Sequence, residues 1–236
     1  MADPFKDRGI ILDIDEADGG LRALLGKSLP RPGIWGVKVG DCILKDGVID
    51  ALRGCANMNT FVDLKHGDTP DRMERIMEIY ARLHMPPTFV SVCGFWDEGM
   101  LSRAVHHAGP MQVIMVTVPS HWDDRVAIRG YRLTCDELLS DMEQKAYDAG
   151  VHGITCPAWL LPELQECTKK EMHVVATGVR SRGMPVHNHA HPVSSAEAFK
   201  QGATHAVVGR EITRSETPIQ DLFALADACQ EAKSYA

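Results

Sequence analysis

Eight short, mostly apolar segments, separated by longer polar stretches, constrain the fold of this chain more than any other feature. Their apolar residues run continuously and are rich in Val and Ile, which is typical of strands buried on both faces of a parallel sheet. The predicted strands are Gly9–Asp13, Ile34–Val39, Thr60–Leu64, Thr88–Val92, Gln112–Thr117, Gly153–Cys156, His173–Ala176 and His205–Val208.

Helical patterns lie between several of these segments. Pro70 stands in the first turn of one, where a missing N–H is tolerated, and Thr134 and Glu137 form a capping box at the start of another. We predict helices at Pro70–His84, Thr134–Ala149, Ser194–Gln201 and Pro218–Lys233. Eight strands that alternate with helices favour an α/β fold of the closed (β/α)8 TIM barrel type over a doubly wound sheet. No Gly-x-Gly-x-x-Gly follows the first strand, so a Rossmann dinucleotide site has no support.

Length and composition fit one such domain spanning residues 1–236, since these barrels run to about 250 residues. The formal net charge of −7 argues against a nucleic-acid-binding surface. No apolar run approaches the roughly 20 residues of a membrane span. The seven cysteines are scattered without a Cys-x-x-Cys pair, which is typical of reduced thiols. We therefore expect a cytoplasmic protein that binds neither nucleic acid nor membrane.

Charged residues gather at the ends of the first three predicted strands. Asp63 and Lys65 are two residues apart, so on a regular strand both side chains point the same way. Lys38 ends the second strand and Asp13 ends the first. Since the chemistry of these barrels lies at the C-terminal ends of the strands, and buried charges are costly unless paired, we predict a functional cluster rather than a surface ion-pair layer.

Five motifs follow one another along the chain: Asp13, Lys38-Val-Gly40, Asp63-x-Lys65-x-x-Asp68 with Thr69-Pro70, Gly178-Val-Arg180 and Val208-Gly-Arg-Glu-Ile-Thr213. In this order they resemble the motifs of the orotidine 5′-monophosphate decarboxylase family. The resemblance implies decarboxylation of orotidine 5′-monophosphate to uridine 5′-monophosphate in de novo pyrimidine biosynthesis, without a metal or an organic cofactor.

The resemblance also implies catalytic roles for four of these residues. Lys65 would protonate the ring carbon that loses CO₂, beside a departing carboxylate that faces Asp63. Lys38 would pair with Asp63 and reach the ribose, and Asp13 would accept a hydrogen bond from a ribose hydroxyl. Asp68 would cross a two-fold interface into the partner's site, which implies a homodimer.

Substrate-binding residues follow the later strands. The resemblance assigns Ser120 to the pyrimidine amide. Gly178 and Gly209 allow backbone N–H groups to approach a phosphate, a common feature after strands seven and eight of such barrels. Arg210 can bind phosphate through two parallel hydrogen bonds, whereas Arg180 has the weaker case and could serve only to shape its loop.

The chain departs from the family pattern at several positions. His189 stands where the family has a Gln that bridges phosphate and base, Arg72 replaces a Thr, and Cys93 stands where relatives often have His. The alternating His187, His189 and His191 raise a metal site as a lesser alternative.

Two other functions stay open. One is a related sugar-phosphate decarboxylase or aldolase of the same superfamily, which would be metal-assisted and would carry an acidic residue in place of Lys38. The other is a nucleotide-binding homologue with little catalysis, suggested by His189 and Arg72.

Overall fold

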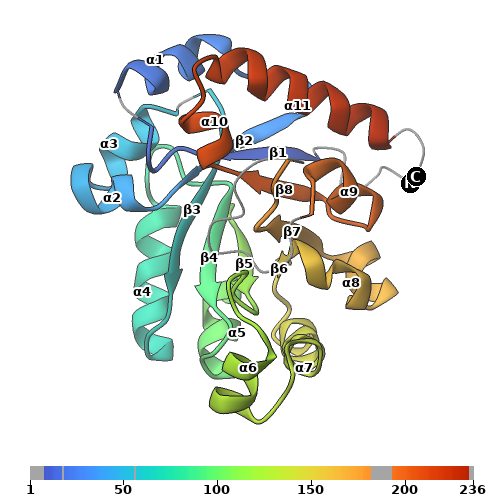
Figure 1. Cartoon of the computed structure of the whole chain (residues 1–236). Helices are drawn as coiled ribbons and strands as arrows, with labels where there is room; N and C mark the ends of the chain where they lie inside the picture. Colours follow the sequence, from blue (N-terminus) through green and yellow to red (C-terminus); the bar gives the residue numbers. More distant parts are fainter. Residues whose placement is uncertain (1–7, 18, 56, 182–192, 234–236) are drawn as a thin grey trace.

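In the computed structural model, which describes residues 8–17, 19–55, 57–181 and 193–233, eight parallel strands close into a barrel in chain order (Figure 1). They are β1 Gly9–Asp13, β2 Ile34–Val39, β3 Asn59–His66, β4 Phe89–Cys93, β5 Gln112–Val116, β6 Gly153–Pro157, β7 His173–Thr177 and β8 His205–Val208. β8 pairs with β1, which closes the ring. The predicted (β/α)8 barrel is confirmed, and the strand bounds agree within two residues.

Helices surround the barrel, with α1 and α11 side by side along one edge (Figure 1). The helices are α1 Gly19–Ser28, α2 Asp41–Asp46, α3 Val48–Arg53, α4 Pro70–Ala81, α5 Glu98–His106, α6 Asp124–Tyr131, α7 Cys135–Asp148, α8 Glu166–Glu171, α9 Ser195–Lys200, α10 Arg210–Thr213 and α11 Pro218–Lys233, with a 3₁₀ helix η1 at Ala158–Glu163. The capping box of Thr134 and Glu137 is present at the start of α7. α4 ends three residues earlier than predicted, at Ala81.

The strands bury side chains on both faces, as their continuous apolar sequences predict. The outward-facing side chains pack against the helices in one large cluster. Inward-facing side chains fill the barrel with a second, smaller cluster, in which Trp35 stacks on Phe89 with ring centroids 4.3 Å apart. Since the barrel interior is filled, substrate-sized space is left at the ends of the strands.

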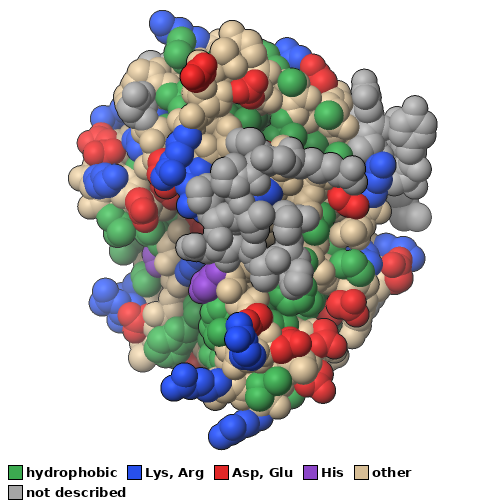
Figure 2. All heavy atoms as spheres, viewed as in Figure 1, with side chains coloured by type: hydrophobic (Ala, Val, Ile, Leu, Met, Phe, Trp, Pro, Cys, Tyr) green, Lys and Arg blue, Asp and Glu red, His purple; other side chains and the backbone are tan. Residues whose placement is uncertain are grey.

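The outer surface is polar and mixed in charge. On the face seen in Figure 2, Lys and Arg side chains and Asp and Glu side chains both occur around the rim. Among the described residues, no helix combines the length and apolar composition that crossing a membrane requires.

Candidate active site

A cavity of about 630 Å³ opens at the C-terminal ends of the strands. Most of the predicted site residues line it, although they come from six different loops or strand ends. Those that line it are Asp13, Lys38, Asp63, Lys65, Ser120, Gly178, Arg180, Gly209 and Arg210. Asp68 does not line the cavity within this chain, and His189 lies outside the described residues. Among the described residues, the strand ends therefore bring together every predicted site residue except Asp68.

The ammonium group of Lys38 lies at the centre of the cluster. Its Nζ is 3.1 Å from Asp13 Oδ2, 3.1 Å from Asp15 Oδ2 and 3.5 Å from Asp63 Oδ2. Burial alone would lower the pKa of Lys38, but the three carboxylates outweigh it and raise this pKa above its ordinary value. Lys38 is therefore a permanent cation that neutralises part of a carboxylate-rich site.

The three carboxylates differ in how they respond to this cation. Burial raises the pKa of Asp13, and the attraction of Lys38 does not fully offset it. Burial likewise opposes ionisation of Asp63, but Lys38 and Lys65 outweigh it and hold the pKa of Asp63 below its ordinary value. The pKa of Asp15 is also lowered, because Lys38 and the backbone N–H of Gly40 outweigh burial. Asp63 and Asp15 are thus ionised at neutral pH.

Lys65 lies in the cluster as predicted, but its backbone does not have the regular strand conformation on which the prediction was based. Its Nζ lies 2.9 Å from Asp63 Oδ2, so the expected pair is present. However, the backbone of Lys65 is left-handed, with φ of 50°, and the β3–β4 pairing shifts register between Val62 and His66. The buried Ser91 hydroxyl on β4 holds this turn by accepting a hydrogen bond of 2.7 Å from the Lys65 N–H. Sequence reasoning missed Ser91, because a lone serine inside an apolar strand carries no signal.

Asp68 lies in the loop between β3 and α4. Its Oδ1 accepts a hydrogen bond of 2.8 Å from the Thr69 N–H, and its Oδ2 lies 3.0 Å from Arg72 Nε. Its side chain is 40% exposed. Arg72 therefore contacts the motif aspartate itself, a pairing that a Thr at this position could not make.

Two arginines, Arg180 after β7 and Arg210 after β8, line the cavity on the side of these two strands. Gly178 follows β7 with φ of +72°, a conformation that favours glycine, and positions the loop that carries Arg180. Burial and the nearby charge of Arg210 both lower the pKa of Arg180. Two neighbouring guanidinium groups repel each other unless an anion lies between them, so this side of the cavity favours a phosphate.

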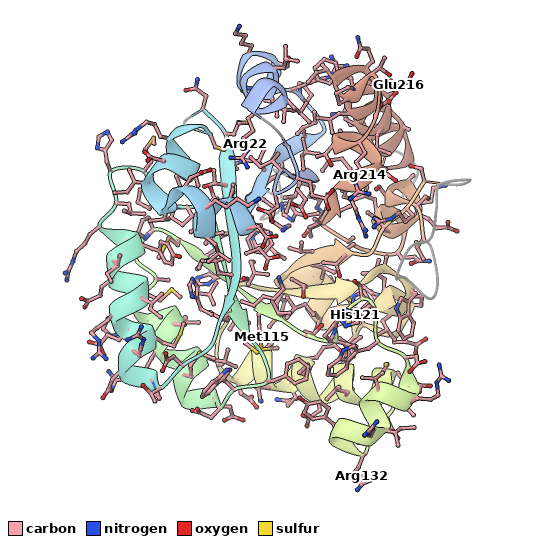
Figure 3. The ribbon with its side chains drawn as sticks, turned by 60° about the vertical axis from the view of Figure 1, so that its left-hand side comes forward. Arg22, Met115, His121, Arg132, Arg214 and Glu216 are labelled. Carbon is pink, nitrogen blue, oxygen red and sulfur yellow. The ribbon has the colours of Figure 1, made fainter. Side chains whose placement is uncertain are left out.

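Another part of the cavity wall is more apolar. It is built by Val116 at the end of β5 and by Val118 and Pro119 after it, with Ser120 as the predicted polar group. His121, labelled in Figure 3, follows Ser120 and also lines the cavity.

Phe95 and Cys93 add to this apolar wall from β4 and the loop that follows it. The ring of Phe95 lies 5.5 Å from that of Trp122 and 5.0 Å from that of Tyr131. An apolar slot with isolated polar groups suits a planar heterocycle. Sequence reasoning missed Phe95, because an aromatic in a loop is not distinctive.

Histidine and carboxylate side chains also gather away from the cavity. Glu74, Glu78 and His107 bring potential ligand atoms within 4.8 Å of one another on α4 and the end of α5. Arg103 is already paired with Glu74 at 2.8 Å, which is typical of a surface ion-pair network. The predicted alternative of a metal at His187, His189 and His191 lies outside the described residues.

Comparisons with known proteins agree with this geometry. Residues 28–224 match the family described as orotidine 5′-phosphate decarboxylase / HUMPS. A protein named orotidine 5′-phosphate decarboxylase from Methylacidiphilum infernorum is 28% identical over 215 residues, which cover 89% of this chain and 91% of that one. A protein of the same name from Streptococcus thermophilus is 26% identical over 160 residues, covering 67% and 69% of the two chains.

A solved structure supports the same fold. The orotidine 5′-phosphate decarboxylase of Lactobacillus acidophilus superposes with a TM-score of 0.76 at 22% identity, covering 94% of this chain and 99% of that one. At this identity the likeness bears on the fold alone. The sequence match, however, takes in most of the chain, so the protein belongs to the orotidine 5′-phosphate decarboxylase / HUMPS family.

Proposed function

We propose that this protein is a carboxy-lyase that converts orotidine 5′-monophosphate to uridine 5′-monophosphate in de novo pyrimidine biosynthesis. The observation that carries the proposal is the contiguous array of Lys38, Asp63 and Lys65 at the mouth of a barrel of this family. The names of the relatives from Methylacidiphilum and Streptococcus point to the same reaction.

The reaction follows from the charges of this array. The bond between the ring carbon and the substrate carboxylate breaks, CO₂ leaves, and the electron pair stays on the ring carbon. Lys65 stabilises this developing carbanion with its positive charge and then donates a proton from Nζ to the same carbon. The neutral amine regains its proton from solvent, since 55% of the Lys65 side chain is exposed. Asp63, 2.9 Å from Lys65 Nζ, keeps the ammonium aimed at the carbon.

The rest of the cavity fits the rest of the nucleotide. Asp13 and Lys38 would bind the ribose hydroxyls beside the charge array. Arg180 and Arg210 would bind the phosphate. Ser120 would hydrogen-bond the pyrimidine amide along the apolar wall.

A metal-assisted sugar-phosphate reaction is the less favoured alternative. A divalent cation at this site would need the carboxylates of Asp13, Asp15 and Asp63 as ligands. The Lys38 ammonium contacts all three of these carboxylates, at 3.1 to 3.5 Å. Because these carboxylates are already paired with the Lys38 ammonium, they are less available as ligands for a metal.

We also propose that the protein acts as a cytoplasmic homodimer. Asp68 belongs to the motif but does not line the cavity of its own chain. Its exposed position in a loop suits a contribution to the site of a second copy. Among the cysteines that the structure describes, six are free thiols and five of these are buried, which favours a reducing compartment.

Turnover of orotidine 5′-monophosphate tests the proposed function. We expect uridine 5′-monophosphate to form at a rate that EDTA does not change. Lys65→Ala should lower kcat by about 10²–10⁴-fold, because the proton donor is lost. The matched control Lys170→Ala, on the exposed face of α8, should keep the wild-type rate. Tight binding of uridine 5′-monophosphate without turnover would instead indicate a nucleotide-binding homologue, and loss of activity in EDTA would indicate the metal-assisted branch.

A further inference from the structure

Asp15 stands at the meeting point of three parts of the charged site, although the family motifs do not include it. Its Oδ2 accepts a hydrogen bond of 3.1 Å from Lys38 Nζ. Its Oδ1 accepts hydrogen bonds from the Gly40 N–H at 2.7 Å and the Cys42 N–H at 3.3 Å. Its own N–H donates to Asp13 Oδ1 at 3.1 Å. The side chain of Asp15 therefore connects the lysine of β2 to the first turn of α2, and its backbone N–H ties both to the end of β1.

Hydrogen bonds and an ion pair hold the segment that carries Asp15 in place. The Ile14 N–H donates to the Lys38 carbonyl at 3.1 Å. Arg22 and Arg214, both labelled in Figure 3, approach from α1 and from the end of α10: Arg22 Nε donates to the Ala17 carbonyl, and Arg214 pairs with Glu16 at 2.9 Å. The position of the Asp15 carboxylate is thus determined by its surroundings, and the side chain is only 14% exposed.

The donors of Lys38 explain what Asp15 adds. An ammonium group has three N–H bonds, and Lys38 faces three carboxylates. In the proposed mechanism Asp13 and Asp63 face the substrate, whereas Asp15 is held by two backbone N–H groups at the start of α2, those of Gly40 and Cys42. Without Asp15, the ammonium has two acceptors left and is free to move toward either of them.

We propose that Asp15 is a positioning residue, which anchors the Lys38 ammonium between Asp13 and Asp63 and so keeps Asp63 aligned with Lys65. The proposal rests on the proposed function, since the benefit of this alignment is realised in the decarboxylation step. Asp15 acts through Lys38 and makes no contact with the reacting carbon. Its loss should therefore lower kcat more than it weakens substrate binding.

Asp15→Asn separates this role from a merely structural one. The amide oxygen of Asn can still accept the Gly40 and Cys42 N–H bonds, but its NH₂ group cannot accept from Lys38. Asp15→Ala removes both functions. Asp141→Asn, on the exposed face of α7, is the matched control.

We expect Asp15→Asn to fold with a Tm close to that of the wild type. Its kcat for orotidine 5′-monophosphate should fall at least about tenfold, while KM and the Kd of uridine 5′-monophosphate change less than about threefold; tenfold corresponds to about 1.4 kcal/mol of transition-state stabilisation. Asp15→Ala should have a lower Tm as well as a lower kcat, and Asp141→Asn should change neither value. A wild-type kcat in Asp15→Asn would overturn the proposal. A fall in kcat accompanied by a fall in Tm as large as that of Asp15→Ala would also overturn it, because the loss would then be structural.

A spectroscopic measurement keeps this outcome separate from failure of the proposed function. The lysine ammonium signals in ¹H–¹⁵N spectra report anchoring without any turnover, and Lys38→Met identifies the signal of Lys38. We expect a protected Lys38 signal in the wild type that is lost in Asp15→Asn. If the wild type fails to turn over the nucleotide, the proposed reaction is wrong, and the signal still decides whether Asp15 anchors Lys38. If the signal is equally protected in Asp15→Asn, the anchoring itself is refuted.

Discussion

At the scale of single residues, the site consists of buried charges that stabilise one another, although each of them would be costly to bury alone. Lys38 is stable in its buried position because three carboxylates surround it, and these carboxylates are stable because of Lys38. Strand-end reasoning predicted Asp13, Lys38, Asp63 and Lys65 as neighbours, since parallel strands end on the same side of a barrel. It did not predict Asp15, because that residue lies in a loop whose path depends on tertiary contacts.

Replacing Lys38 by Met should therefore give a stability defect that depends on pH. Breaking a buried ion pair by removing one partner costs about 3–5 kcal/mol near neutral pH. Without the cation, burial raises the folded-state pKa values of the three carboxylates, so the folded protein binds protons more tightly than the unfolded chain. Its stability then rises as the pH falls.

The wild type should not gain stability in this way. The lowered pKa of Asp63 contributes stability that is fully present above its unfolded pKa, so this contribution stays constant down to about pH 5 and is lost only as the pH falls further through the folded pKa. Thermal unfolding of both proteins between about pH 8 and pH 5 should give curves that converge toward acid, whereas Lys170→Met should follow the wild type throughout. Parallel curves for Lys38→Met and the wild type would contradict the charge balance.

The hydrogen bond between Ser91 and Lys65 leads to a second prediction about a single residue. Its hydroxyl accepts from the N–H of Lys65, whose left-handed backbone needs such support. Ser91→Ala leaves this partly buried N–H without its acceptor, at a cost of about 1 kcal/mol. Chemical unfolding should show this loss together with a lower kcat, while Ser102→Ala on the exposed face of α5 should show neither. An unchanged kcat in Ser91→Ala would mean that Lys65 is held by other contacts.

At the scale of elements, strands were easier to predict than helices, for a physical reason. Most strands are buried on both faces, so their sequences are largely apolar and their bounds are sharp, whereas β3 is charged and partly exposed in its second half. The helix α7 was equally clear because its capping box marks its start. Helices α2 and α3 are only six residues each, too short for an apolar period to appear, and they were not predicted.

The close approach of β2 and β3 at Gly36 leads to a prediction about the stability of the protein. A Cβ added to Gly36 on β2 would lie 2.1 Å from the Asn59 carbonyl oxygen of β3, a backbone atom that cannot turn aside. Gly36→Ala should therefore cost about 3 kcal/mol or more, since the β2–β3 pairing must move. Gly130→Ala is the matched control, because its Cβ meets nothing within 4 Å and Ala favours the helix α6 by about 1 kcal/mol. Urea unfolding should move the two variants in opposite directions, and equal stability would contradict the close approach.

At the scale of the whole molecule, the barrel explains why residues far apart in sequence share one cavity. Asp13 and Arg210 are nearly 200 residues apart, yet they meet because β8 pairs with β1. The ordered strand ends made this predictable. Phe95 was not predictable, because its place in the apolar wall depends on how the loop after β4 packs against Trp122.

The position of Asp68 leads to a prediction about assembly. If Asp68 serves the partner's site, a dimer of one Lys65→Ala subunit and one Asp68→Ala subunit contains one site with both residues intact. Random mixing of two inactive variants should then recover about a quarter of the wild-type activity, because half of the two-fold dimers are mixed and each has one complete site. Mixing Lys65→Ala with Asp63→Asn should recover nothing, since both residues belong to the same chain's site. Activity that stays absent in the first mixture, although mass measurement detects mixed dimers, would place the role of Asp68 within its own chain, where its 3.0 Å pair with Arg72 would then be the functional contact.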